Sequence, residues 1–215
     1  MTNLRIGSKF GKPAIPLLIT AMSRPEKSVA KTSVEALGKI RDYHAISPLE
    51  KILLTHDESE IQMEAGIALG RIGDKKIKKI LYKVVKNTNR WDRLVAALIG
   101  LVCSNDTIAK NFVFDIIANG GLYKDNKAVD DAARVHLVMG LALIRDTDGL
   151  QVIYEFKEKL ILENSKQSLQ YAEAVSTFAN VLEDILHPKK DPEQEEFELQ
   201  NKKLDEEHER LMGSN

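Results

Sequence analysis

The chain has 215 residues, of which 43% are hydrophobic and 29% charged, and its formal net charge is -1. A chain of this size buries roughly 70% of its unfolded surface, and this composition excludes a disordered or low-complexity protein. Because Cys103 is the one cysteine, and no apolar run approaches the ~18 residues of a membrane span, we expect a cytoplasmic protein without disulfides or a membrane span.

An internal repeat organises the chain up to about residue 186. In each copy of the repeat, a small or aliphatic residue stands directly before a Leu, and another aliphatic residue stands three positions after that Leu. Apolar residues three or four positions earlier extend each copy into the stripe of an amphipathic helix. Small side chains beside the Leu allow neighbouring helices to approach closely. The five copies centre on Leu37, Leu69, Leu98, Leu141 and, more weakly, Leu182.

A second helix is predicted in each repeat unit, before or between these stripes. The segments assigned to these second helices are residues 14–17, 45–49, 77–85, 108–117 and 150–160. Prolines fall in the first turn of the two earliest, where a helix tolerates a missing amide hydrogen. We expect these second helices to be capped by Asp74, Asp106 and Asp148, and the first helices to begin with the capping boxes Ser23/Glu26 and Asp57/Glu60.

No strand is predicted. A strand would appear as a run of β-branched residues that alternate with polar ones and are flanked by turn-forming residues, and the sequence has no convincing run of this kind. Residues 119–126 contain two glycines and several turn formers, which indicate an exposed loop. Residues 4–7 resemble the end of a first helix, so we expect the chain to start either with a half repeat that acts as a cap or inside a longer array.

The repeats resemble the HEAT family, particularly the short HEAT-like units first described in phycobilisome lyases. The best matches are residues 68–74, Ala-Leu-Gly-Arg-Ile-Gly-Asp, and residues 36–42, Ala-Leu-Gly-Lys-Ile-Arg-Asp. This resemblance implies an all-α fold, a right-handed α-α superhelix of about five helical pairs in residues 1–186. It also implies that the second helices line a concave face that binds proteins.

Signatures of catalysis are weak. Met63 and Glu64 stand where iron-binding HEAT enzymes have His and Glu, and residues 7–13 have the wrong spacing for a phosphate loop. Cys103 lies in an apolar helix end, where a packed thiol is typical. We therefore expect no enzyme, no metal and no cofactor. A lyase-type enzyme or enzyme subunit is the alternative that the resemblance leaves open.

A basic helix gives the most specific hint of function. Residues 71–93 carry nine basic and two acidic side chains. Helical spacing places the basic ones opposite an apolar stripe, and we expect them inside the concave groove. The predicted binding residues are Lys75, Lys79, Tyr82, Lys83, Lys86 and Arg90.

Such a row of cations fits an acidic segment of a protein partner. We therefore predict a scaffold or adaptor that binds a protein through its concave face and loops. Nucleic-acid phosphates, bound through residues 75–93, are the less favoured alternative, because the isoelectric point is near 6.5 and acidic blocks flank the helix.

The C-terminal residues 187–215 form a charged tail, with five basic and nine acidic side chains. Phe197, Leu204 and Leu211 recur every seven residues, which predicts a helix with a narrow apolar seam. Such a helix docks on the last repeat, pairs as a short coiled coil, or remains a frayed helix.

Overall fold

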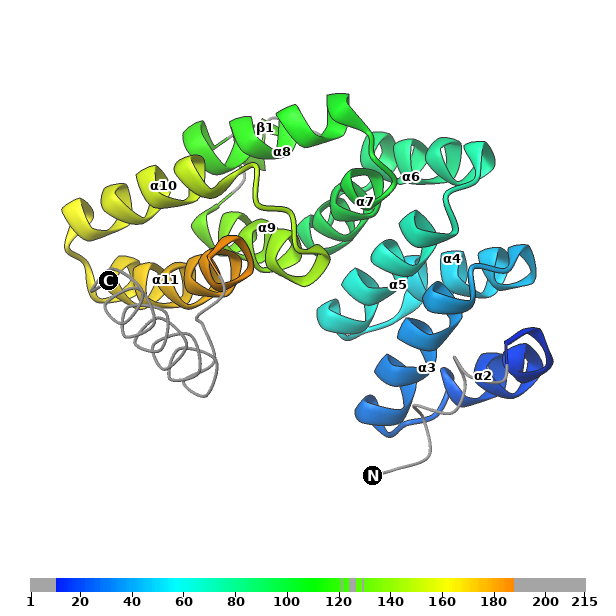
Figure 1. Ribbon diagram of the computed structural model, residues 1–215. Helices are drawn as coiled ribbons and strands as arrows, with labels where there is room; N and C mark the ends of the chain where they lie inside the picture. Colours follow the sequence, from blue (N-terminus) through cyan, green and yellow to red (C-terminus); the bar gives the residue numbers. More distant parts are fainter. Residues whose placement is uncertain (1–10, 121, 124–126, 129, 188–215) are drawn as a thin grey trace, which may run out of the picture.

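The computed structural model describes residues 11–120, 122–123, 127–128 and 130–187. The predictions for the tail after residue 187 and for the segment before residue 11 lie outside these residues. The described part is an arch of two helical rows, with the inner row on its hollow side (Figure 1). The outer row consists of α2 (Ile15–Ala21), α4 (Ile46–Thr55), α6 (Lys75–Asn87), α8 (Thr107–Asn119) and α10 (Leu150–Glu163). The inner row consists of α3 (Lys27–Ile40), α5 (Ser59–Ile72), α7 (Trp91–Cys103), α9 (Asp131–Ile144) and α11 (Lys166–Leu186).

These helical pairs confirm the predicted all-α solenoid. The repeated Leu positions are buried between the rows, since Leu37, Leu69 and Leu141 have no exposed surface and Leu98 is only 2% exposed. Each outer helix packs on the inner helix of its pair, and successive inner helices pack on one another. One continuous core therefore runs through the described array.

The second helices do not line the hollow side of the arch, so the predicted position of the basic helix in a concave groove is wrong (Figure 1). The reason is the size of the residues at the contacts. Gly38 of α3 lies against Ala68 of α5, and Gly66 lies against the backbone of α7. Inner helices therefore approach closely, while α4 and α6 hardly touch. Because successive inner helices lie closer together than α4 and α6 do, the array bends toward the inner row, which therefore lines the hollow side of the arch.

Short elements complete the chain. Two 3-10 turns, η2 (Lys12–Ala14) and η3 (Tyr43–Ala45), lead into α2 and α4. A loop is predicted at residues 119–126, but β1 (Leu122–Tyr123) within this segment pairs antiparallel with β2 (Lys127–Ala128) just after it. Two residues per strand are too few for an alternating pattern to be recognised in the sequence.

Helix caps agree only in part with the predictions. The Asp74 and Asp106 carboxylates accept hydrogen bonds from the backbone N–H groups of Lys76 and Ala109, which confirms both caps. The predicted cap at Asp148 is wrong, because Gly149 occupies the N-cap of α10.

Both predicted capping boxes are also wrong. The N-caps of α3 and α5 are Glu26 and Glu58, and neither makes a side-chain cap bond. The N-cap of α3 thus lies three residues after Ser23. In front of α5, the Glu58 N–H donates instead to His56 Nδ1 at 3.0 Å, which makes a local turn before the helix.

Candidate functional site: a basic cleft on the outer row

The basic residues of α6 lie on its solvent face. Ile77, Leu81 and Val84 are buried and hold the helix on the core. Helical periodicity then directs a row of lysines away from the core, and every member of the row is exposed. This lysine row consists of Lys75, Lys79, Lys83 and Lys86. Among the described residues, none of these four ammonium groups forms an ion pair.

Tyr82, another predicted site residue, is turned toward α8. Its hydroxyl donates to Asp106 Oδ1 at 2.8 Å, and Lys78 Nζ lies 3.2 Å from Asp106 Oδ2. Burial raises the pKa of Tyr82, and the Asp106 carboxylate raises it further. Burial acts to raise the pKa of Asp106 as well, but hydrogen bonds from Ala109 N–H, Tyr82 and Lys78 outweigh it and lower that pKa. Tyr82 therefore joins two helices.

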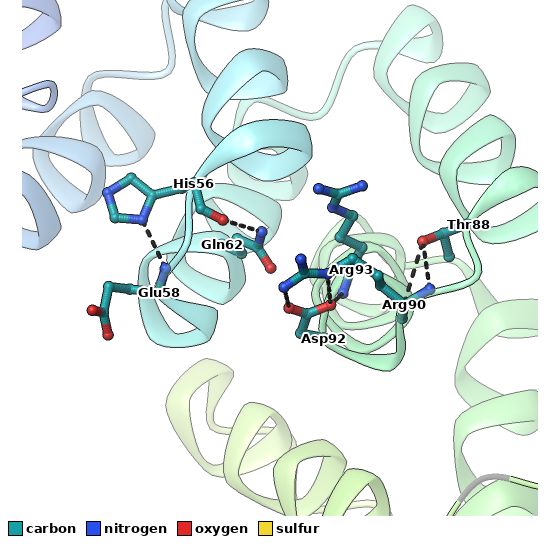
Figure 2. Close-up of polar contacts among 7 residues, drawn as sticks. All are labelled: His56, Glu58, Gln62, Thr88, Arg90, Asp92 and Arg93. Atoms are coloured by element: carbon teal, nitrogen blue, oxygen red, sulfur yellow. Dashed lines mark hydrogen bonds and ion pairs between the residues drawn. The ribbon is translucent and has the colours of Figure 1, made fainter.

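Arg90 is likewise engaged within the protein. Its guanidinium forms two hydrogen bonds to Asp92, at 3.1 and 2.5 Å (Figure 2). Burial acts to raise the pKa of Asp92, but the bonds from Arg90 and from the Arg93 backbone N–H outweigh it, and the pKa is lowered. This pair holds the turn from α6 to α7, which Thr88 also stabilises through its bonds to the Arg90 backbone. The structure thus separates Arg90 and Tyr82 from the lysine row.

Beside the lysine row, the gap between α4 and α6 forms an open cleft of about 190 Å³. Aliphatic side chains form one part of its wall, and polar and charged groups form the rest. Its lining residues are Glu50, Leu54, Ile80, Lys83, Val84, Asn87, Thr88 and Arg93. Lys83 is therefore common to the lysine row and to the cleft, which we name the Arg93 cleft.

Arg93 is the residue of this site that the sequence analysis missed. It comes from the first turn of α7, and its side chain extends away from the Arg90–Asp92 pair (Figure 2). Its Nε is buried and has no hydrogen-bond partner among the described residues. No spacing in the sequence marks Arg93, because the cleft exists only where α4 and α6 are held apart above α7.

Several charges on the inner row and at its helix starts are paired with each other. Lys31 pairs with Glu60 at 3.1 Å and Lys39 with Glu35 at 2.6 Å, in addition to the Arg90–Asp92 pair. A further pair joins Arg71 to Glu64 at 3.3 Å. The lysine row and Arg93, by contrast, form no ion pair among the described residues, so their positive charge on the outer face of α6 and at the Arg93 cleft is uncompensated.

The described residues contain no group of three or more His, Cys, Asp or Glu side chains arranged to hold a metal ion. No helix among them is both long and apolar enough to cross a membrane. Burial raises the pKa of the Cys103 thiol, which disfavours the thiolate that a nucleophilic cysteine needs.

The paired helices in two rows form an α-α solenoid. The family model described as HEAT repeats matches residues 10–101, which run from just before η2 into α7, and this confirms the predicted resemblance. A similar solved structure is the complex of CpcE and CpcF of phycocyanin lyase from Nostoc sp. PCC7120. It has 14% identity and a TM-score of 0.33, and the match covers 83% of this chain and 91% of that chain. No curated protein matches the chain.

Proposed function

We propose that this protein is a non-enzymatic scaffold that binds an acidic segment of a partner protein along the outer face of α6. HEAT repeats suggest a protein-interaction role. The observation that carries the proposal is the lysine row, since Lys75, Lys79, Lys83 and Lys86 are exposed and form no ion pair among the described residues. Isolated ammonium groups on one helical face attract a chain of carboxylates without a fixed geometry.

The neighbouring cleft favours a protein over a nucleic acid. Leu54, Ile80 and Val84 give it an aliphatic wall, which a peptide side chain can cover and a phosphate backbone cannot. The isoelectric point of about 6.5 also argues against a general affinity for nucleic acids. The lyase-type alternative stays a prediction, which a chromophore that copurifies with the protein would support.

Charge reversal on α6 tests the proposal. The Lys79→Glu/Lys86→Glu variant changes two exposed side chains that do not line the Arg93 cleft. Its matched control is Lys51→Glu/Lys166→Glu, which makes the same change of net charge at exposed positions on α4 and α11. The probe is a fluorescein-labelled peptide of alternating Glu and Leu, followed by anisotropy at low and at physiological salt.

We expect the α6 variant to lose at least ~10-fold in affinity, about 1.4 kcal/mol, because two attractions become repulsions. The control is expected to change affinity less than ~2-fold. A labelled DNA duplex is expected to bind more weakly than the peptide. Equal losses in both variants, or tighter binding of the duplex, would argue against the proposal.

A further inference from the structure

We infer that the Arg93 cleft is an anchoring subsite for one carboxylate side chain of the acidic segment. The inference rests on the proposed function and deepens it, because the lysine row alone accounts for attraction but not for a choice of sequence. The subsite selects a glutamate or aspartate that has an aliphatic neighbour.

The Arg93 guanidinium makes no hydrogen bond among the described residues. Buried polar atoms nearly always have a hydrogen-bond partner, and the Nε of Arg93 has none among the described residues. Because this Nε has almost no accessible surface, a carboxylate in the cleft reaches Arg93 through its two Nη groups, which make no hydrogen bond among the described residues. The edge formed by the two Nη groups also binds a carboxylate with two parallel hydrogen bonds.

The acids near Arg93 leave its two Nη groups unoccupied. Asp92 is occupied by the Arg90 guanidinium, and one of its oxygens also accepts the Arg93 backbone N–H at 2.9 Å. Glu50 lines the same cleft but forms no ion pair with Arg93 in the described structure. Arg93 is thus a cation whose nearest carboxylates are engaged elsewhere or held apart.

The size and charge of the cleft suit a carboxylate side chain. About 190 Å³ is less than the ~300–1,000 Å³ of typical cofactor and small-molecule pockets, so the cleft suits one or two side chains. Lys83 and Arg93 against Glu50 leave one net positive charge. A monoanionic carboxylate balances this charge, whereas a dianionic phosphate would leave an excess of negative charge beside Glu50.

The aliphatic wall of the cleft suits an aliphatic neighbour of that carboxylate. Leu54 and Ile80 are half-buried and Val84 is buried, each on the cleft side of α4 or α6. An aliphatic side chain next to the anchoring carboxylate would cover this wall and exclude water from the ion pair. Exclusion of water strengthens a charged hydrogen bond, so the two parts of the subsite support each other.

The test measures binding of two peptides to three variants by fluorescence anisotropy. The first peptide has one central Glu between two Leu residues, with acidic residues after them, and the second has Gln in place of that Glu. Arg93→Lys keeps the charge but loses the two-pronged edge, and we expect it to weaken binding of the Glu peptide ~10-fold. Arg93→Gln is expected to weaken it at least as much. Glu50→Gln is expected to tighten binding ~3-fold, because it removes the competing acid.

A double-mutant cycle distinguishes a direct contact from a general charge effect. We expect the Gln peptide to bind the wild type and Arg93→Lys with equal affinity. Unchanged binding of the Glu peptide to Arg93→Lys would overturn the inference, and so would an equal loss for both peptides. Tighter binding of a phosphoserine peptide than of the Glu peptide would overturn the choice of carboxylate.

The outcomes also separate this inference from the proposed function. If Lys79→Glu/Lys86→Glu weakens binding but Arg93→Lys does not, an acidic segment binds α6 and the cleft is not its anchor. If neither changes affinity, both proposals fail. Thermal melting by circular dichroism checks that the variants are folded. Should the Arg93 variants unfold, Glu50→Gln keeps the test decisive, because unchanged or weaker binding to it contradicts the inference.

Discussion

Replacing Gly66 by Ala tests the close contact between α5 and α7 that we hold responsible for the curvature of the arch. A Cβ atom added at Gly66 would lie 2.0 Å from the Ala96 carbonyl oxygen and 2.7 Å from its carbon. Ordinary van der Waals contact begins at 3.4 Å, so this gap would have to widen from 2.0 to 3.4 Å. The obstacle is backbone, which cannot rotate aside as a flexible side chain can.

Neighbouring glycines make the contact difficult to relieve. A Cβ at Gly70 would meet the Gly100 oxygen at 2.2 Å, and one at Gly100 would meet the Gly66 oxygen at 2.4 Å. The two helices therefore touch along several turns, and widening the gap at Gly66 loosens the contact at both other positions.

The magnitude follows from two opposing effects. Overpacking of a core costs about 1–3 kcal/mol, and the upper end applies here because the colliding atoms belong to the backbone. Alanine is better than glycine inside a helix by about 1 kcal/mol. We therefore expect Gly66→Ala to lower the free energy of unfolding by about 2 kcal/mol. In a protein of this length such a loss lowers the Tm by roughly 4–8 °C.

Urea denaturation and thermal melting, both followed by circular dichroism, measure this loss. Adding Ala96→Gly to the variant is the control, and it should not restore stability, because the collision is with the Ala96 backbone oxygen. A Gly66→Ala protein as stable as the wild type, or more stable, would refute the close approach of α5 and α7 and with it our account of the curvature.

Three further predictions concern stability. Leu69→Ala should cost about 2–5 kcal/mol in urea denaturation, because Leu69 is fully buried, and a loss below about 0.5 kcal/mol would contradict the repeat register. Burial raises the pKa of Glu64 above its usual 4.5, although Arg71 opposes this. Stability is therefore lost as the pH rises from 4.5 through that raised pKa, because the buried carboxyl group becomes ionised. Glu64→Gln should therefore stabilise the protein near neutral pH and have little effect below about pH 4, whereas a pH-independent difference would refute this. The pKa of Asp106 is lowered in the fold, so its ionised form stabilises the protein, and this contribution is lost as the pH falls. Asp106→Ala should therefore cost about 1–2 kcal/mol at neutral pH and less as the pH falls below 3.8.

The helical pairs were predictable because they depend on local information. A repeated Leu with small neighbours marks the buried stripe of each inner helix, and Leu37, Leu69, Leu98 and Leu141 all lie in the core. The spacing of the lysines opposite Ile77 is also local, since a helix with 3.6 residues per turn separates its two faces wherever it packs. For this reason the lysine row is exposed as the sequence predicts.

Only the tertiary structure decided which helical row lies inside the arch and which basic side chains form ion pairs within the protein. The curvature depends on distances between helices of different repeats, such as that from Gly66 to the Ala96 backbone, which no periodicity records. Arg90 resembles a member of the basic row in sequence, but the turn before α7 brings it to Asp92. No sequence pattern marks Arg93 as a site residue. Its cleft forms only because the inner helices pack closely and leave α4 and α6 of the outer row apart.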